Sequence, residues 1–143
     1  MQTAAITETT VLKLLGIIDA GLSNGMGEPI PGHMCIEAAV CFALGLPHGD
    51  DPKCVALSLR RLKIGLNDRQ WSSDQARARG LRRLAVAQLG SAGVLDEKEF
   101  RRRVVDMTIR KCVPMALRAA ASMKSNSAFA EPLEAAAVRC EQE

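Results

Sequence analysis

The segment from Met34 to Leu44 constrains this fold more than any other, because a helix built from it is apolar on every face except at Glu37. A helix that is hydrophobic all round belongs in the interior of a protein, covered by its neighbours. Aromatic residues make up 3% of the chain and tyrosine is absent, so the core must be built from aliphatic side chains. Such a core favours helices over sheets, and we expect an all-α fold.

Apolar residues recur at helical spacing along the rest of the chain, and no stretch alternates as a strand would. With capping residues and glycine or proline breaks as boundaries, the predicted helices cover about residues 7–22, 34–44, 52–66, 73–89, 97–122 and 132–141. Asp51 and Ser72 are the expected N-caps of the third and fourth helices. Pro114 lies inside the longest predicted helix, where it predicts a kink or a break.

These elements predict a compact single-domain bundle of five or six helices over residues 1–143. The ends, residues 1–6 and 124–143, are the parts predicted to be mobile, with a loose linker at 124–130.

The net charge of +3 conceals an uneven distribution. Residues 1–52 hold one lysine and six acids, residues 53–124 hold 17 cations and six acids, and residues 125–143 hold one arginine and four glutamates. One interpretation is that acidic and basic helices neutralise each other within the fold. The other is an electropositive face for an acidic protein or for nucleic acid phosphates.

Five cysteines, an odd number, are not spaced as a disulfide framework, and residues 1–10 contain no cation of a secretory signal. Both features predict a cytoplasmic protein with reduced thiols. The apolar stretch at 34–46 is too short to span a bilayer and is broken by Glu37, so we expect no membrane partner. The oligomeric state is left open by the sequence.

The densest cluster of reactive side chains surrounds the central helix. Its members are His33, Cys35, Glu37, Cys41, His48, Asp50, Asp51 and Cys54. Cys35 and Cys41 are six residues apart, about 120° around a helix, so they cannot both reach one zinc ion. Cys41 and Cys54 are better explained as small buried apolar residues, and we predict no metal and no cofactor.

Cys35 and Glu37 leave alternatives open. Cys35 lies in the first turn of the predicted helix, where the helix dipole favours a thiolate, and His33 or His48 with Asp50 could complete a nucleophilic site. Its apolar neighbours would instead bury the thiol and raise its pKa. Glu37, a lone carboxylate on an apolar helix, predicts either a buried ion pair, with Arg110 or Arg118 by pattern, or a catalytic or ligand-binding group.

The middle of the chain resembles a family of small, uncharacterised proteins of bacteria and their phages. The resemblance covers about residues 25–120. It is carried by three patterns: Met34-Cys35-x-Glu37-Ala38; Ala43-x-Gly45-x-Pro47-His48-x-Asp50-x-Pro52-x-Cys54 followed by Asn67-Asp68; and Asp106-x-x-x-Arg110-x-x-x-Pro114-x-Ala116-Leu117-Arg118. It implies no particular activity. It does imply that Glu37, His48, Asp50, Asn67 and Arg110 form one polar arrangement around the central helix.

These observations favour a small non-enzymatic binding protein, associated by resemblance with phages or mobile elements. A basic helical surface would engage an acidic protein or nucleoprotein partner, as an inhibitor or adaptor of host machinery, including an anti-defence role. The predicted binding residues are Arg60, Lys63, Arg79, Arg82 and Arg83. The alternative is an enzyme or a ligand- or metal-binding domain that uses Cys35, Glu37, His48 and Asp50.

Overall fold

The computed structural model describes residues 5–142, and every regular element in that range is helical. An isolated bridge between Gly27 and Met34 is the one β pairing in the described range. Six helices are present there when the continuous stretch from Glu97 to Ala121 is counted as one. The predicted all-α class and helix number are confirmed.

Internal contacts divide the chain into two compact units, and the division falls between Glu97 and Lys98. The N-terminal unit holds α1 (Glu8–Asp19), α2 (Ile36–Ala43), α3 (Leu57–Asn67) and α4 (Asp74–Ala87). From the boundary onward follow α5 (Glu97–Met107), the π-helical segment η1 (Thr108–Cys112), α6 (Val113–Ala121), the 3-10 segment η2 (Lys124–Phe129) and α7 (Ala130–Gln142). That residues 1–143 form one domain stays a prediction.

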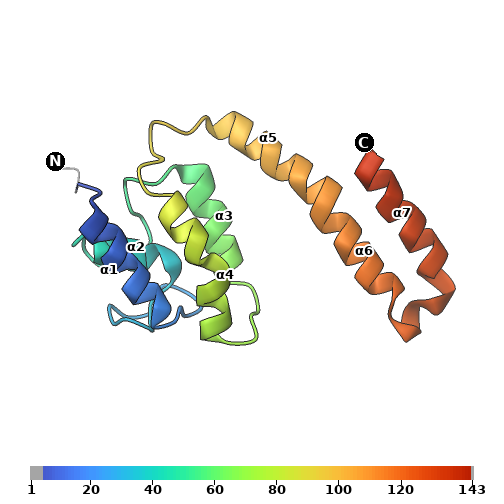
Figure 1. Ribbon diagram of the computed structural model, residues 1–143, viewed down its shortest axis with the longest axis horizontal. Helices are drawn as coiled ribbons and strands as arrows, with labels where there is room; N and C mark the ends of the chain where they lie inside the picture. Colours follow the sequence, from blue (N-terminus) through green and yellow to red (C-terminus); the bar gives the residue numbers. More distant parts are fainter. Residues whose placement is uncertain (1–4, 143) are drawn as a thin grey trace. The chain divides into compact units, whose positions relative to one another are not determined.

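Helix α2 is the centre of the N-terminal unit, as its composition predicts. It contacts α1, α3 and α4, and seven of its eight residues are buried (Figure 1). Leu14 and Ile18 of α1 and Leu81 and Ala85 of α4 belong to the same buried cluster. Each large aliphatic side chain buried there contributes about 1.5–3 kcal/mol to the free energy of unfolding. Because α2 contacts all three other helices of the unit, the core forms around it.

The predicted start of the third helix is wrong. Helix α3 begins at Leu57, five residues later than expected, and its N-cap residue Ala56 provides no side-chain hydrogen bond. The Asp51 carboxylate forms ion pairs with Lys53 and Arg60 instead of capping. The two nearby cations attract this carboxylate more effectively than unpaired backbone N–H groups would.

The cap of α4 is also shifted by one residue from the prediction. Ser73, not Ser72, accepts the hydrogen bond from the backbone N–H of Ala76, at 3.0 Å. Gln75 does not complete a capping box, because its side-chain amide donates to the Ala20 carbonyl at 3.0 Å. Helix α4 is thereby tied to the C-terminal end of α1.

The disruption predicted at Pro114 is present, but as a change of helix type rather than a break. The backbone from Thr108 to Cys112 adopts π-helical hydrogen bonding immediately before α6, which carries Pro114 in its first turn. Proline lacks an N–H and collides with the carbonyl four residues earlier, and a widened turn relieves both problems. Residues 124–129, predicted as a linker, form η2, while residues 1–4 of the predicted mobile N-terminus lie outside the described residues.

Trp71, the one tryptophan of the chain, lies against Gly80 of α4. Its indole N–H donates to the Leu66 carbonyl at 3.0 Å, which fixes the ring over the helix. A Cβ added at Gly80 would approach the ring carbons of Trp71 to 2.5 Å. Glycine is therefore required at this position by the close approach of the ring.

We expect Gly80→Ala to lower the free energy of unfolding by about 1–3 kcal/mol, although alanine is the better helix former, because the ring must move. The measurement is thermal unfolding together with Trp71 fluorescence. Gly65→Ala in α3 is the matched control, since a Cβ there meets nothing within 4 Å, and it should stabilise by up to about 1 kcal/mol. Equal effects of the two substitutions would contradict the steric argument.

Candidate functional site

The polar centre of the N-terminal unit is an ion pair between Glu37 of α2 and Lys63 of α3. The Glu37 Oε1 and Lys63 Nζ atoms are 2.9 Å apart, and both side chains are 0% exposed. The predicted buried ion pair at Glu37 is therefore present, but the predicted partner is wrong. Arg110 pairs with Asp106, and Arg118 pairs with Glu134 and Glu141, all within the C-terminal unit.

The prediction that Lys63 faces solvent in a binding surface is also wrong. Lys63 lies four residues after Leu59 and three before Leu66, so it occupies the side of α3 that packs toward the core. This spacing was the signal in the sequence. Lys63 stands at a core-facing position of α3, and Glu37 stands at a core-facing position of α2, so each could supply the other's partner.

Burial outweighs mutual attraction in the titration of this pair. Loss of hydration raises the pKa of Glu37 and lowers the pKa of Lys63, although each charge favours the other. The half-buried Arg60 guanidinium and the fully buried Gln88 amide favour the charged form of Glu37 more weakly. Both shifts favour the neutral forms in the folded protein. The ion pair therefore specifies how α2 and α3 pack more than it adds to the free energy of unfolding.

Asn67, at the end of α3, holds the start of α2 in place. Its Oδ1 accepts a hydrogen bond from the Ile36 N–H at 3.2 Å, and its Nδ2 donates to the Ser23 carbonyl at 3.0 Å. Buried side-chain amides are costly unless both ends are bonded, so this asparagine is specified by its surroundings. The family resemblance implies that Asn67 and Glu37 belong to one polar arrangement, and both residues lie in the α2–α3 contact.

Cys35 is the N-cap residue of α2 rather than a member of its first turn. Its Sγ accepts a hydrogen bond from the Ala38 N–H at 3.4 Å, which favours a thiolate. Burial is the larger effect and raises the pKa of this thiol, and it raises the pKa of Cys41 to about 11. Both thiols are therefore protonated at neutral pH, which makes them poor nucleophiles.

A small pocket opens beside Cys35. Its free volume is about 30 Å³, which is enough to hold bound water. The lining residues are Gly25, Met26, Cys35, Ile36, Asp50, Ile64, Asn67 and Asp68. Asp50 thus lies near Cys35 and Asn67, but Glu37 is not part of the lining.

The remaining predicted site residues are dispersed. His48 hydrogen-bonds within the fold, as expected, with its Nε2 2.9 Å from the Gly27 carbonyl oxygen. Arg110 belongs to the C-terminal unit, 2.8 Å from Asp106, and not to the α2–α3 contact. Within residues 5–142, no three histidine, cysteine, aspartate or glutamate side chains gather so that they could hold a metal ion.

Three of the seven arginines of the N-terminal unit have carboxylate partners. Arg60, Arg77 and Arg82 form ion pairs with Asp51, Asp74 and Asp19 respectively. Arg77 is buried and also donates to the carbonyls of Leu22 and Asn67, at 2.8 Å each. Internal neutralisation, one of the two interpretations of the charge pattern, therefore accounts for these three cations.

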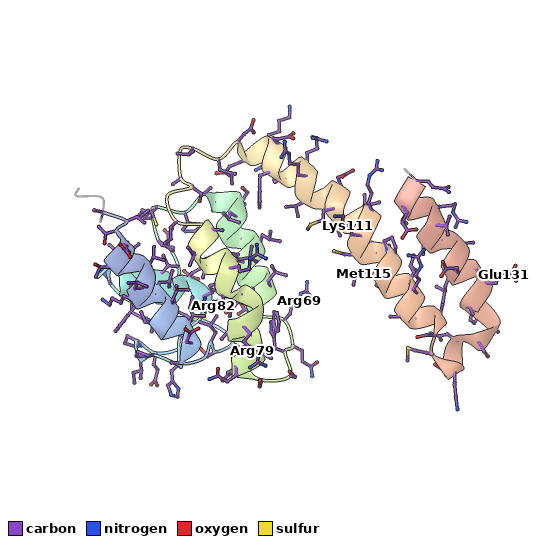
Figure 2. All side chains as sticks on the ribbon, in the orientation of Figure 1. Arg69, Arg79, Arg82, Lys111, Met115 and Glu131 are labelled. Atoms are coloured by element: carbon purple, nitrogen blue, oxygen red, sulfur yellow. The ribbon has the colours of Figure 1, made fainter. Side chains whose placement is uncertain are left out.

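The other four are Arg61, Arg69, Arg79 and Arg83, and of these only Arg79 and Arg83 belong to α4. Both are exposed, and they lie one turn apart on α4; Arg82 and Arg79 project from this helix in Figure 2. Neither Arg79 nor Arg83 has a carboxylate within ion-pair distance in the described part of the chain. We call these two side chains the α4 basic face. Of the five predicted binding residues, Lys63 is buried, and Arg60 and Arg82 have carboxylate partners. The α4 basic face is what remains of that predicted surface.

No family model, no curated protein and no solved structure matches this chain.

Across residues 5–142, none of the helices has the length and apolarity needed to cross a membrane.

We expect Glu37→Ala to lower the free energy of unfolding by about 3–5 kcal/mol, because it leaves Lys63 buried without its partner. Glu37→Gln should cost less, since the amide still offers an oxygen to Lys63. The double variant Glu37→Leu/Lys63→Met should unfold within about 1 kcal/mol of the wild type, because both desolvation costs disappear together. Urea denaturation of all variants measures these differences, and additive single effects would contradict a coupled pair.

The thiols should separate by reactivity. We expect Cys112, which is exposed, to react with an aromatic disulfide reagent at least about 100-fold faster than Cys35 or Cys41, which require an opening of the fold. Stopped-flow absorbance measures the phases, and Cys112→Ser should remove the fast one. A fast phase that survives in Cys112→Ser and disappears in Cys35→Ser would revive the nucleophile interpretation.

Proposed function

We propose that this protein is a small, non-enzymatic binding protein that engages an acidic partner protein through the α4 basic face. In keeping with the family resemblance, it would act in the cytoplasm on behalf of a phage or mobile element. Its role would be that of an inhibitor or adaptor of host machinery, including host defence. The α4 basic face is the observation that carries this proposal.

The support comes from the position of Arg79 and Arg83, two exposed arginines one turn apart on α4. Three arginines of the N-terminal unit have carboxylate partners, so this fold has acids available to neutralise cations. Arg79 and Arg83 project side by side from α4 without such partners in the described range. Exposed, desolvatable guanidinium groups form bidentate bonds with carboxylates, which suits recognition of an acidic surface.

An acidic protein is favoured over nucleic acid as the partner. Residues 1–97 contain ten lysines and arginines and ten acids, so the N-terminal unit as a whole has no excess of positive charge. Proteins that bind duplexes non-specifically need many phosphate contacts and a broad positive field. Two arginines provide a local contact, which fits a carboxylate cluster better than a phosphate backbone.

The alternative of an enzyme at Cys35, Glu37, His48 and Asp50 is less favoured, although Cys35 and Asp50 line the same small pocket. Its thiol is buried with a raised pKa, and its glutamate faces Lys63 rather than the pocket.

Replacement of Arg79 and Arg83 together by glutamate should abolish binding to labelled poly-glutamate, used as an acidic polypeptide probe, and leave the melting temperature nearly unchanged. Fluorescence anisotropy at several salt concentrations measures the affinity, which should fall as salt rises because the contacts are exposed. The matched control is Lys124→Glu/Arg139→Glu, the same charge change in the C-terminal unit, which should retain binding.

A second arm uses a labelled 20-base-pair DNA duplex. Tight binding of the duplex with a steep salt slope, lost in the Arg79→Glu/Arg83→Glu variant, would assign the face to nucleic acid instead. Equal binding of poly-glutamate by the wild type and by this variant would overturn the proposal.

A further inference from the structure

The indole of Trp71 is partly buried, packed against the core of the N-terminal unit on one side. Its N–H already donates to the Leu66 carbonyl, so the ring needs no water molecule as a hydrogen-bond partner. The ring carbons at the opposite end of the indole lie over Gly80 of α4. The part of Trp71 that remains accessible is therefore apolar surface, which a partner can cover without leaving a polar group unbonded.

Arginines border this indole at both ends. The backbone N–H of Arg69 donates to the same Leu66 carbonyl at 3.3 Å, so the α3–α4 loop carries Arg69 beside the nitrogen end of the ring (Figure 2). At the other end, Arg79 and Arg83 lie about 100° and 60° around α4 from Gly80, both on the same side of it, by helical geometry. The α4 basic face therefore borders the ring that covers Gly80.

All three of these arginines are exposed, and none has a carboxylate within ion-pair distance among residues 5–142. The carboxylates nearest to them in the sequence are held by other groups. Asp68 accepts hydrogen bonds from the Gly25 N–H and from the Asn67 amide. Asp74 pairs with Arg77. The positive charge around the indole is therefore available to the carboxylates of a partner.

A tryptophan bordered by arginines has the composition of the energetic centre of a protein–protein interface, where Trp, Tyr and Arg dominate the binding energy. Guanidinium groups bond carboxylates in pairs, and an indole contacts apolar or aromatic side chains. An aromatic side chain suits this surface best, because it can stack on the indole and also receive cation–π contacts from the adjacent arginines. Single-stranded nucleic acid fits less well, since it binds through several successive aromatic platforms, and the chain has one tryptophan and three phenylalanines.

We propose that Trp71 is the centre of the site for the acidic partner and that Arg69 is the third cation of this site. The partner segment that fits it carries an aromatic side chain among its carboxylates. This inference rests on the proposed function, because it extends the α4 basic face by the indole and by Arg69. It goes beyond that function by specifying the neutral side chain that the acidic segment must contain.

The test compares two labelled probes of equal length, poly-glutamate and a glutamate–tyrosine copolymer, by fluorescence anisotropy with the full chain. We expect the copolymer to bind at least about tenfold more tightly, because only its tyrosines can cover the indole. Arg69→Glu should weaken binding of both probes at least about tenfold, because it places a like charge against their carboxylates. The matched control is Arg61→Glu, at an exposed arginine on the side of α3 opposite Lys63, and it should leave both affinities unchanged.

The contribution of the ring is measured with Trp71→Leu. This variant should still bind poly-glutamate through Arg79 and Arg83 and should lose the preference for the copolymer. Should its melting curve show that it does not fold, the emission of Trp71 in the wild type replaces this measurement. That emission, excited where tyrosine does not absorb, should shift when the copolymer binds and stay constant in the Arg69→Glu variant at the same copolymer concentration.

The outcomes separate this inference from the proposed function. If poly-glutamate binds through Arg79 and Arg83 but the copolymer binds no more tightly, the inference is wrong and the proposed function stands. The same holds if Arg69→Glu binds both probes as the wild type does. If neither probe binds, both proposals are wrong. Tighter binding of a single-stranded oligonucleotide than of the copolymer would assign the surface to nucleic acid and overturn the inference.

Discussion

The buried contact between Glu37 and Lys63 is the interaction on which the N-terminal unit depends. It joins the central helix α2 to α3 at a point from which water is excluded, so no other partner can replace either charge. An apolar core tolerates sliding and rotation of its helices, whereas a buried charge has one acceptable position. The pair thus fixes the rotation of α2 and α3 about their axes, and Asn67 fixes the start of α2 in the same contact.

The distribution of partners among the cations connects this core to the proposed binding role. Lys63 neutralises a buried acid, and Arg77 ties the α3–α4 turn to the end of α1 through backbone carbonyls. Lys63 and Arg77 are thus held by interactions within the fold, whereas Arg79 and Arg83 are exposed on one face of α4. The α4 basic face therefore contains two of the five cations that the sequence predicts for the binding surface. A surface of this size favours a local acidic contact over a long phosphate backbone.

The two units differ in how their apolar residues are used. The N-terminal unit buries its aliphatic side chains around α2, while the C-terminal unit exposes Met107 and Met115 and buries almost nothing. Composition does not predict this difference, because both units are rich in alanine and both contain valine and methionine. Apolar side chains exposed on this scale are typical of a surface that packs against another element or chain.

The sequence by itself determined the helical class, the central position of α2 and the burial of Glu37 on that helix. Each follows from local information: a helix apolar on all sides has one stable environment, and a carboxylate within it needs a cation. The helix of residues 97–121 and its disturbance at Pro114 were determined in the same way, from periodicity and the missing N–H of proline.

The tertiary structure alone decided which cation meets Glu37 and which arginines remain exposed. Pairing depends on the angle at which two helices cross and on their relative rotation, and neither is encoded in the spacing within one helix. Asp51 shows the same limit at a helix start, because its capping propensity was overridden by Lys53 and Arg60, which only the fold brings close. Local pattern fixes which face a residue occupies, whereas its partner is set by the packing of elements far apart in the chain.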